Sequence, residues 1–443
     1  MVRRRLVAAL SLLAAVILGG GTAFAQQNRI DTVSPVAPEL AAYGAMPVGV
    51  RTMAATDRRR PDVLATKPGG EVVRRDRTLT IEVWYPAALA PGQAPGVEYR
   101  TVARDPARPT VLHGRAVRDA APDARGPYPL VILSHGYPGN RYLLAHLGEN
   151  LASKGFVVAS IDHPESTYDD QKPFVSTLYH RPSDQLFVLD ELDRLSRPGS
   201  ATFLAGLADA SRTAVVGYSM GGYGLLNVLG AGFSDGAVNA SGAPPNRLLF
   251  ERAASNPAFS KGADPRIRAA IALAPWGVPA GTWTADAFKA IAVPVLFVAG
   301  SADDVSGFEK GTRAAFEGTV NAERCLLTFL NGGHNVAAPI PAPAEAYAFS
   351  ETLKAFPFGH YADPVWDTAR SNNILQHFAT AFLSLHLKGE RAMAAYLDLV
   401  PRGADAVYSA ERDGRLKPDH TYSKGFKPRT AVGLVFERLG PGK

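Results

Sequence analysis

The chain contains only one cysteine, Cys325, in 443 residues. One thiol cannot form an internal disulfide, and it excludes a zinc site built from several cysteines. Basic residues are not clustered in the way that nucleic-acid binding requires, and we interpret the run at residues 58–60 as a solvated loop. We therefore expect no nucleic-acid partner. Because 46% of the residues are hydrophobic, we expect a large apolar core to stabilise the protein.

Long hydrophobic runs are also scarce, and the clearest one lies at the N-terminus, from Leu6 to Leu18. It follows three arginines and precedes Ala23-Phe24-Ala25, which is the pattern of a secretory signal peptide cleaved after Ala25. A retained anchor is the alternative, but the run is shorter than the roughly 20 residues that a spanning helix needs. We therefore predict a secreted or periplasmic protein that starts at Gln26 and has no stable membrane span. Loss of the leader would lower the net charge from +6 to +3.

Short apolar runs recur along the rest of the chain and alternate with helix-like segments. Nearly continuous runs of this length are typical of buried parallel strands. We expect strands at residues 79–85, 129–134, 156–161, 213–216, 269–274, 293–298 and 326–330, and helices at 142–155, 185–195 and 223–229. The alternation predicts an α/β fold with a mostly parallel central sheet flanked by helices.

Two segments interrupt this rhythm. Residues 87–125 are rich in Pro, Ala and Arg, and we expect an irregular surface excursion there. Residues 231–266 are loop-like and occupy the place of a cap insertion. The expected organisation is a signal peptide at 1–25, an N-terminal extension at 26–69, a main domain at 70–402, and a tail at 403–443 that packs on it and holds a strand at 432–436.

The pentapeptide from Gly217 to Gly221 fits the pattern Gly-x-Ser-x-Gly, with Ser219 at its centre. It lies between a predicted strand and a predicted helix, where a tight turn can hold a serine hydroxyl exposed above a sheet. A second match places Ser234 at the same spacing, but it falls in a loop-like stretch rich in Gly, Ser and Asn. We therefore predict Ser219 as a nucleophile and interpret Ser234 as a chance match.

A serine nucleophile needs a base, and the base needs an acid that orients it. Asp303 and His334 each follow a predicted strand. The resulting chain order, Ser219, Asp303, His334, is the order expected for α/β-hydrolases. Asp304 competes with Asp303 for the role of the acid. Parallel strands present functional side chains beyond their carboxyl ends, so we expect the three groups to meet there.

Acyl transfer also needs donors for the developing oxyanion. The strand that ends at Ser134 runs into His135-Gly136-Tyr137, where the backbone N–H of Tyr137 can face the substrate carbonyl. The N–H of Met220, directly after the nucleophile, is the second expected donor. An ordinary glycine-rich turn is the alternative explanation.

Together these motifs resemble a secreted serine α/β-hydrolase of the dienelactone-hydrolase-like group. That group is similar to the plasma-type platelet-activating-factor acetylhydrolases and, more distantly, to cutinase-like polyester hydrolases. The resemblance covers roughly residues 43–387 and implies the α/β-hydrolase fold. It rests on the motifs at residues 83–86, 134–137, 217–222, 274–276, 300–303 and 333–334.

Ser219 departs from the pattern of the dienelactone hydrolases, whereas Trp276 follows that of the cutinase-like relatives. True dienelactone hydrolases use a cysteine nucleophile, whereas this chain has Ser219 in the elbow, and Cys325 precedes an apolar run and is expected in the core. In the cutinase-like relatives an aromatic residue lines the acyl pocket after the strand that corresponds to 269–274. The resemblance implies this role for Trp276, and simple packing is the alternative.

The sequence thus predicts serine-dependent hydrolysis of a small-molecule or lipid carboxylic ester through an acyl-enzyme. A phospholipid or platelet-activating-factor-type ester is the alternative substrate, and an exopeptidase or an inactive binding module are further alternatives. No cofactor or metal is expected. The acidic residues Glu165, Asp169 and Asp170 could suggest a cation site, but we interpret them as a solvated loop.

Overall fold

The computed structural model describes residues 28–259 and 262–443. The predicted signal peptide and the predicted mature start at Gln26 therefore lie outside the described residues. Within these two ranges, no helix is both long and apolar enough to cross a membrane.

The strands form one large central sheet and one small sheet. Their bounds are β1 Asn28–Arg29, β2 Val48–Pro61, β3 Arg74–Ala88, β4 Val97–Val102, β5 Pro109–Gly114, β6 Val117–Arg118, β7 Ala121–Pro122, β8 Tyr128–Ser134, β9 Val157–Asp162, β10 Ala208–Tyr218, β11 Ile267–Leu273, β12 Val295–Gly300, β13 Arg324–Phe329 and β14 Leu434–Leu439. The α-helices are α1 Ala145–Ala152, α2 Phe174–Ser196, α3 Met220–Val228, α4 Asp235–Val238, α5 Ala314–Gly318 and α6 Thr368–Lys388. Short helical turns are η1 Glu39–Ala41, η2 Pro245–Arg252, η3 Ala285–Ala290, η4 Phe308–Arg313, η5 Ala344–Tyr347, η6 Pro357–His360 and η7 Arg391–Tyr396.

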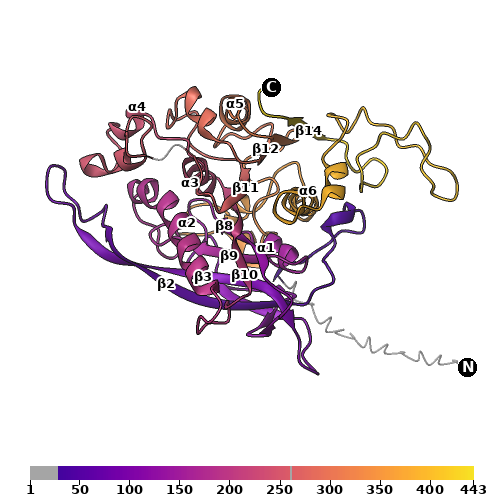
Figure 1. The fold of residues 1–443 in the computed structure, drawn as a ribbon, viewed down its shortest axis with the longest axis horizontal. Coiled ribbons are helices and arrows are strands. Elements are labelled where there is room, and N and C mark those ends of the chain that lie inside the picture. Colours follow the sequence, from indigo (N-terminus) through magenta and orange to yellow (C-terminus); the bar gives the residue numbers. More distant parts are fainter. Residues whose placement is uncertain (1–27, 260–261) are drawn as a thin grey trace, which may run out of the picture.

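The central sheet has the strand order β14-β13-β12-β11-β10-β8-β9-β3-β2-β6. Neighbouring strands from β13 to β9 are parallel, whereas β3 is antiparallel to β9 and β14 is antiparallel to β13. The long β2–β3 pair sweeps along one side of the molecule, and β14 lies on the other (Figure 1). The predicted mostly parallel sheet with flanking helices is confirmed.

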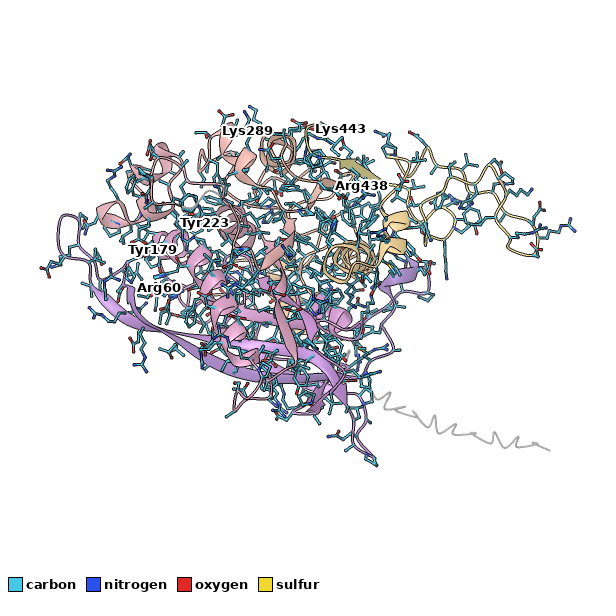
Figure 2. The ribbon with its side chains drawn as sticks, in the orientation of Figure 1. Arg60, Tyr179, Tyr223, Lys289, Arg438 and Lys443 are labelled. Carbon is cyan, nitrogen blue, oxygen red and sulfur yellow. The ribbon has the colours of Figure 1, made fainter. Side chains whose placement is uncertain are left out.

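Two apolar layers cover the two faces of this sheet. α1 and α6 pack on one face, with side chains such as Leu147 and Phe378 in the core. α2, α3 and α5 pack on the other face, with Leu189 and Phe316 among their buried residues. α2 and α3 lie side by side, and the hydroxyl of Tyr223 on α3 donates to a backbone carbonyl of α2 (Figure 2). Burial on both faces explains why the parallel strands are nearly continuous apolar runs.

The N-terminal part of the sheet differs from the prediction. β2 is hydrogen-bonded to β3 along its length, so the domain boundary expected at residue 70 falls between paired strands of one sheet. The run at 58–60 is also not a solvated loop. It lies in β2, and Arg60 is only 8% exposed because it pairs with Asp57 and the fully buried Asp184.

Residues 87–125 are not an irregular excursion either. β4 and β5 form an antiparallel pair there, and β1 joins β5 to make the small sheet. β4 begins with alternating buried and exposed residues, and this period of two is weaker evidence in a sequence than a continuous apolar run.

The two remaining segments pack on the main domain. The tail pairs through β14 with β13, and this strand runs two to three residues further toward the C-terminus than the expected one at 432–436. The cap-like segment contains α4 and η2 and contacts α2 and α3, where Asn227 donates to the carbonyls of Ala231 and Arg252.

Candidate active site

Ser219 lies on the turn between β10 and α3, in a strained backbone conformation with φ 53° and ψ −111°. The flanking glycines leave no room for a side chain. A Cβ at Gly217 would lie 2.3 Å from the carbonyl oxygen of Gly221, and one at Gly221 would lie 2.0 Å from that of Ser134. The strand, turn and helix therefore hold the hydroxyl of Ser219 at the end of β10, as a nucleophile elbow requires.

Three of the predicted residues come together beyond the carboxyl ends of β10, β12 and β13. His334 Nε2 is 3.0 Å from Ser219 Oγ, and His334 Nδ1 is 3.1 Å from each carboxylate oxygen of Asp303. Asp304 is exposed, and His334 binds Asp303 rather than Asp304. Ser234 has a different use, because its hydroxyl oxygen caps α4 by accepting the N–H of Ala237.

Asp303 is 6% exposed, and its surroundings favour the charged carboxylate. Burial alone would raise its pKa, but the hydrogen bond and the charge of His334, together with the backbone N–H groups of Ser306 and Val305, lower the pKa below its ordinary value. Both backbone donors bind Oδ1. A carboxylate in this position accepts a hydrogen bond from the Nδ1–H group of His334 and so keeps the proton of the neutral ring on Nδ1. The lone pair of Nε2 then faces the hydroxyl of Ser219.

The loop that carries His334 is anchored by residues that the sequence alone did not identify. The Tyr218 ring lies 5.3 Å from the imidazole, and its hydroxyl donates to Asn335 Oδ1 at 2.7 Å. The N–H of Gly333 donates to Asp363 Oδ2 at 2.6 Å. Tyr218 is the variable residue before the nucleophile in the Gly-x-Ser-x-Gly pattern, so the motif itself gave no signal for this contact.

The turn after β8 lies against the nucleophile. A Cβ at Gly136 would be 3.3 Å from Ser219 Cβ, and Tyr137 follows directly. Among the described residues, neither the N–H of Tyr137 nor that of Met220 has a hydrogen-bond acceptor. Met220 opens α3, where the first N–H groups of a helix have no intrahelical partner and carry partial positive charge.

Trp276 is half-buried beside the elbow. Its backbone N–H donates to the carbonyl of Ser219 at 3.1 Å, and its ring lies 5.1 Å from Phe174. Phe174 in turn lies 5.0 Å from the ring of Tyr137. These three aromatic residues form a row next to Ser219. Phe174 was not predicted, because the sequence indicated this helix only from about residue 185.

A second Ser–His–Asp set lies buried below the same turn. Ser134 Oγ is 2.9 Å from His163 Nε2, and His163 Nδ1 is 3.0 Å from Asp184. Ser134 and Asp184 are fully buried, and Arg77 binds the Asp184 carboxylate with two donors at 2.9 Å. Gln185 donates to both Ser134 Oγ and the carbonyl of Gly221, so this set links β8 to the elbow.

The remaining candidates lie apart from the triad. Cys325 is buried in β13, and burial raises its pKa to about 12. In the acidic loop, Asp169 accepts from Thr167, and Asp170 accepts from the N–H of Glu165, whose carboxylate binds Arg75. Across residues 28–259 and 262–443, no group of three His, Cys, Asp or Glu side chains is placed to hold a metal.

Comparisons with known proteins agree with this architecture. Residues 119–240, which include the turn after β8 and the elbow, match the PET hydrolase-like family. Cutinase est1 from Thermobifida alba is 28% identical over 186 residues, which is 42% of this chain and 46% of that protein. Cutinase 1 from Thermobifida cellulosilytica is 26% identical over 220 residues, which is 50% of this chain and 65% of that protein.

Two further proteins are more distant. The platelet-activating factor acetylhydrolase from Cavia porcellus is 24% identical over 41% of this chain and 43% of its own length. The structure of a ferulic acid esterase from Streptomyces cinnamoneus superimposes with a TM-score of 0.51 and 24% identity, and the match covers 80% of this chain and 94% of that one. The chain thus spans less than two thirds of the length of its curated relatives. It has the α/β-hydrolase fold and is distantly similar to cutinases and to a platelet-activating factor acetylhydrolase.

Proposed function

We propose that the chain is a serine hydrolase of carboxylic esters that works through an acyl-enzyme. The observation that carries this proposal is the position of His334, which bridges Ser219 Oγ at 3.0 Å and the Asp303 carboxylate at 3.1 Å. Similarity to cutinases supports the same class of reaction. The intact set of groups favours a catalyst over the inactive binding module.

In the proposed reaction, Ser219 Oγ attacks the ester carbonyl carbon while His334 Nε2 takes the hydroxyl proton. Asp303 accepts the Nδ1 proton in a hydrogen bond and stabilises the imidazolium that forms. His334 then returns the proton to the alkoxide leaving group, which departs as the alcohol. A water molecule then attacks the acyl carbon while His334 Nε2 takes one of its protons. The imidazolium returns this proton to Ser219 Oγ as the bond between Oγ and the acyl group breaks, which releases the carboxylic acid and restores the enzyme.

The tetrahedral intermediate carries a negative oxygen that needs preorganised donors. The N–H groups of Tyr137 and Met220, which have no acceptor within the described part of the chain, border Ser219 and are the donors that we propose. Removing one such donor typically costs roughly 10²–10³ in rate. Trp276, through its position beside Ser219 and Phe174, is proposed to line the acyl side of the site.

The test is hydrolysis of a p-nitrophenyl ester series by the mature chain from residue 26, compared with Ser219→Ala and the matched control Ser234→Ala. We expect Ser219→Ala to lose activity to near background, while Ser234→Ala keeps the kcat of the original protein. Ser234 is a suitable control because it has the same motif spacing but caps α4. Equal rates for the original protein and Ser219→Ala would refute the proposal.

A second candidate function, hydrolysis of lipid-type esters such as phospholipids, is favoured by exposed aromatic side chains near the His334 loop. Tyr347 and Phe356 are 57% and 58% exposed, and Phe349 and Phe358 are also exposed. The segment is joined to the site by Asn335, which donates to the carbonyl of Gly359. Large exposed apolar groups that gather in one segment are typical of interaction sites.

The two candidates differ in their response to substrate aggregation. A lipid-type hydrolase should accelerate when a long-chain ester passes its critical micelle concentration, and the Phe356→Ser variant should lose that acceleration while its rate on p-nitrophenyl acetate stays the same. An esterase of soluble substrates should show a smooth saturation curve. Export, proposed from residues 1–25, is tested by fractionating cells and sequencing the mature N-terminus.

A further inference from the structure

Arg181 is a buried arginine whose guanidinium binds backbone carbonyls and a serine hydroxyl. It lies inside α2 and is only 1% exposed, and no carboxylate of residues 28–259 and 262–443 pairs with it, which is rare for a buried arginine. Its neighbour along the helix, Asp184, is bonded instead to Arg60, Arg77 and His163. Burial lowers the pKa of Arg181 to about 9, so the guanidinium stays charged at neutral pH.

The donors of Arg181 converge on the turn after β8. Nη1 donates to the carbonyl of His135, and Nη2 donates to the carbonyl of Gly136 at 3.4 Å and to Ser166 Oγ. The Gly136 carbonyl has a second contact, because His135 Nδ1 lies 2.7 Å from it. His135 Nε2 accepts the N–H of His163, which leaves the proton on Nδ1 and makes His135 a donor to Gly136.

The Gly136 carbonyl belongs to the same peptide unit as the N–H of Tyr137. In a trans peptide the C=O and N–H bonds point in opposite directions. Donors that hold the carbonyl of Gly136 on the side of α2 therefore turn the Tyr137 N–H away from α2. Gly136 itself lies against Ser219, where its Cβ would be 3.3 Å from the serine Cβ.

We propose that Arg181, assisted by His135, is a positioning residue for the oxyanion hole: it fixes the Gly136–Tyr137 peptide so that the Tyr137 N–H faces the substrate oxygen. A donor that is held in place before the reaction costs no reorganisation in the transition state. A charged hydrogen bond to the carbonyl also polarises the peptide and strengthens its N–H as a donor. This inference rests on the proposed ester hydrolysis by Ser219.

The chain provides a matched control in Arg324. It is 2% exposed and likewise donates to backbone carbonyls, those of Gly440 at 3.3 Å and of Lys443. It opens β13, whereas the His334 loop follows the other end of that strand. Arg181→Met and Arg324→Met therefore remove equally buried guanidinium groups, and only the first one touches the oxyanion turn.

The measurement compares a p-nitrophenyl ester with its thiono analogue, in which sulfur replaces the carbonyl oxygen and fits an oxyanion hole poorly. We expect Arg181→Met to lower kcat on the oxygen ester by about 10- to 100-fold with KM within about threefold, since one donor is worth roughly 10²–10³. The ratio of oxygen-ester to thiono-ester rates should fall by a similar factor. Arg324→Met should keep both the kcat and the ratio of the original protein.

Further variants keep the test decisive. Arg181→Lys keeps the charge but reaches fewer carbonyls, and we expect it to recover part of the lost kcat. If Arg181→Met does not fold, His135→Phe keeps the ring shape and removes the donor to Gly136, and it should lower the same ratio. An unchanged ratio in folded Arg181→Met, or in His135→Phe where Arg181→Met does not fold, would overturn the proposal. Activity that survives in Ser219→Ala would instead refute the proposed hydrolysis by Ser219, on which this inference rests.

Discussion

Replacing Asp303 by asparagine is the sharpest test of the proton-transfer chain. Asp303 Oδ1 accepts the N–H groups of Val305 and Ser306 at 2.9 Å and 2.8 Å, so in the variant the amide oxygen must remain on that side. The amide NH₂ then takes the place of Oδ2 and faces His334 Nδ1. Because an NH₂ group can only donate, Nδ1 must lose its proton and become an acceptor.

The consequence for the reaction is a histidine in the wrong tautomer. With Nδ1 unprotonated, the neutral ring carries its proton on Nε2, which is the atom 3.0 Å from Ser219 Oγ. Nε2 can then no longer accept the serine proton. We expect kcat to fall by about 10⁴, which corresponds to about 5.5 kcal/mol in the activation free energy.

The assay is steady-state hydrolysis of p-nitrophenyl butyrate by the original protein, Asp303→Asn and Asp304→Asn. Asp304 is exposed and next in the chain, so its variant should keep kcat within about twofold, as is usual for surface substitutions. Thermal unfolding of each variant shows whether the fold is kept. A loss of less than tenfold in Asp303→Asn, or an equal loss in Asp304→Asn, would refute the tautomer argument.

Other predictions concern the buried charges and the thiol. Asp184→Asn should lower the free energy of unfolding in urea by about 3–5 kcal/mol, because it removes the charge that the buried Arg77 binds at 2.9 Å and leaves only the longer pair of Arg77 with Glu165 at 3.6 Å. A change below 1 kcal/mol would contradict this. Cys325 should resist a thiol reagent at pH 8 until denaturant is added, because burial raises its pKa to about 12, and rapid native labelling would contradict it. Burial lowers the pKa of His146 to about 4 and that of His377 to about 3, from 6.5, so the unfolded chain takes up protons that the folded chain does not. The free energy of unfolding should therefore fall as the pH drops from 6.5 toward 4, by about 1.4 kcal/mol per pH unit for each such histidine, and a flat urea-unfolding profile would contradict it.

The parallel part of the fold was predictable from local sequence. Each central strand is buried on both faces, so its apolar run is continuous and short, as in β8 from Tyr128 to Ser134. The candidate triad follows from the same regularity. Ser219, Asp303 and His334 each come directly after such a strand, and the carboxyl ends of parallel strands meet at one edge of the sheet.

The parts that were not predictable depend on partners far away in the sequence. Arg60 is buried in β2 with the help of Asp184, which lies 124 residues away and accepts its Nη1 at 3.2 Å. α2 begins at Phe174 rather than near residue 185, and Pro182 inside the helix concealed that start because proline normally disfavours a helix interior. α6 was not predicted, although Asp367 caps its first turn by accepting the N–H of Arg370.

The two Ser–His–Asp sets show why the identity of the residues does not by itself make a catalyst. Asp184 already binds Arg77 and Arg60, so little of its charge is left to stabilise an imidazolium at His163. Burial and the charge of Arg181 lower the pKa of His163 to about 3, which makes it a very weak base.

Asp303, by contrast, binds His334 and two backbone N–H groups, and no arginine or lysine of the described residues pairs with it. Its negative charge therefore remains available when His334 takes a proton. The geometry of the serines differs in the same sense. Ser134 ends a regular strand with its hydroxyl fully enclosed. Ser219 instead lies at φ 53° on a turn, beside two N–H groups that have no acceptor among the residues that the structure describes. Within one fold, the same three residue types thus serve as a buried support when cations surround the acid, and as a candidate catalyst when the acid faces only the imidazole.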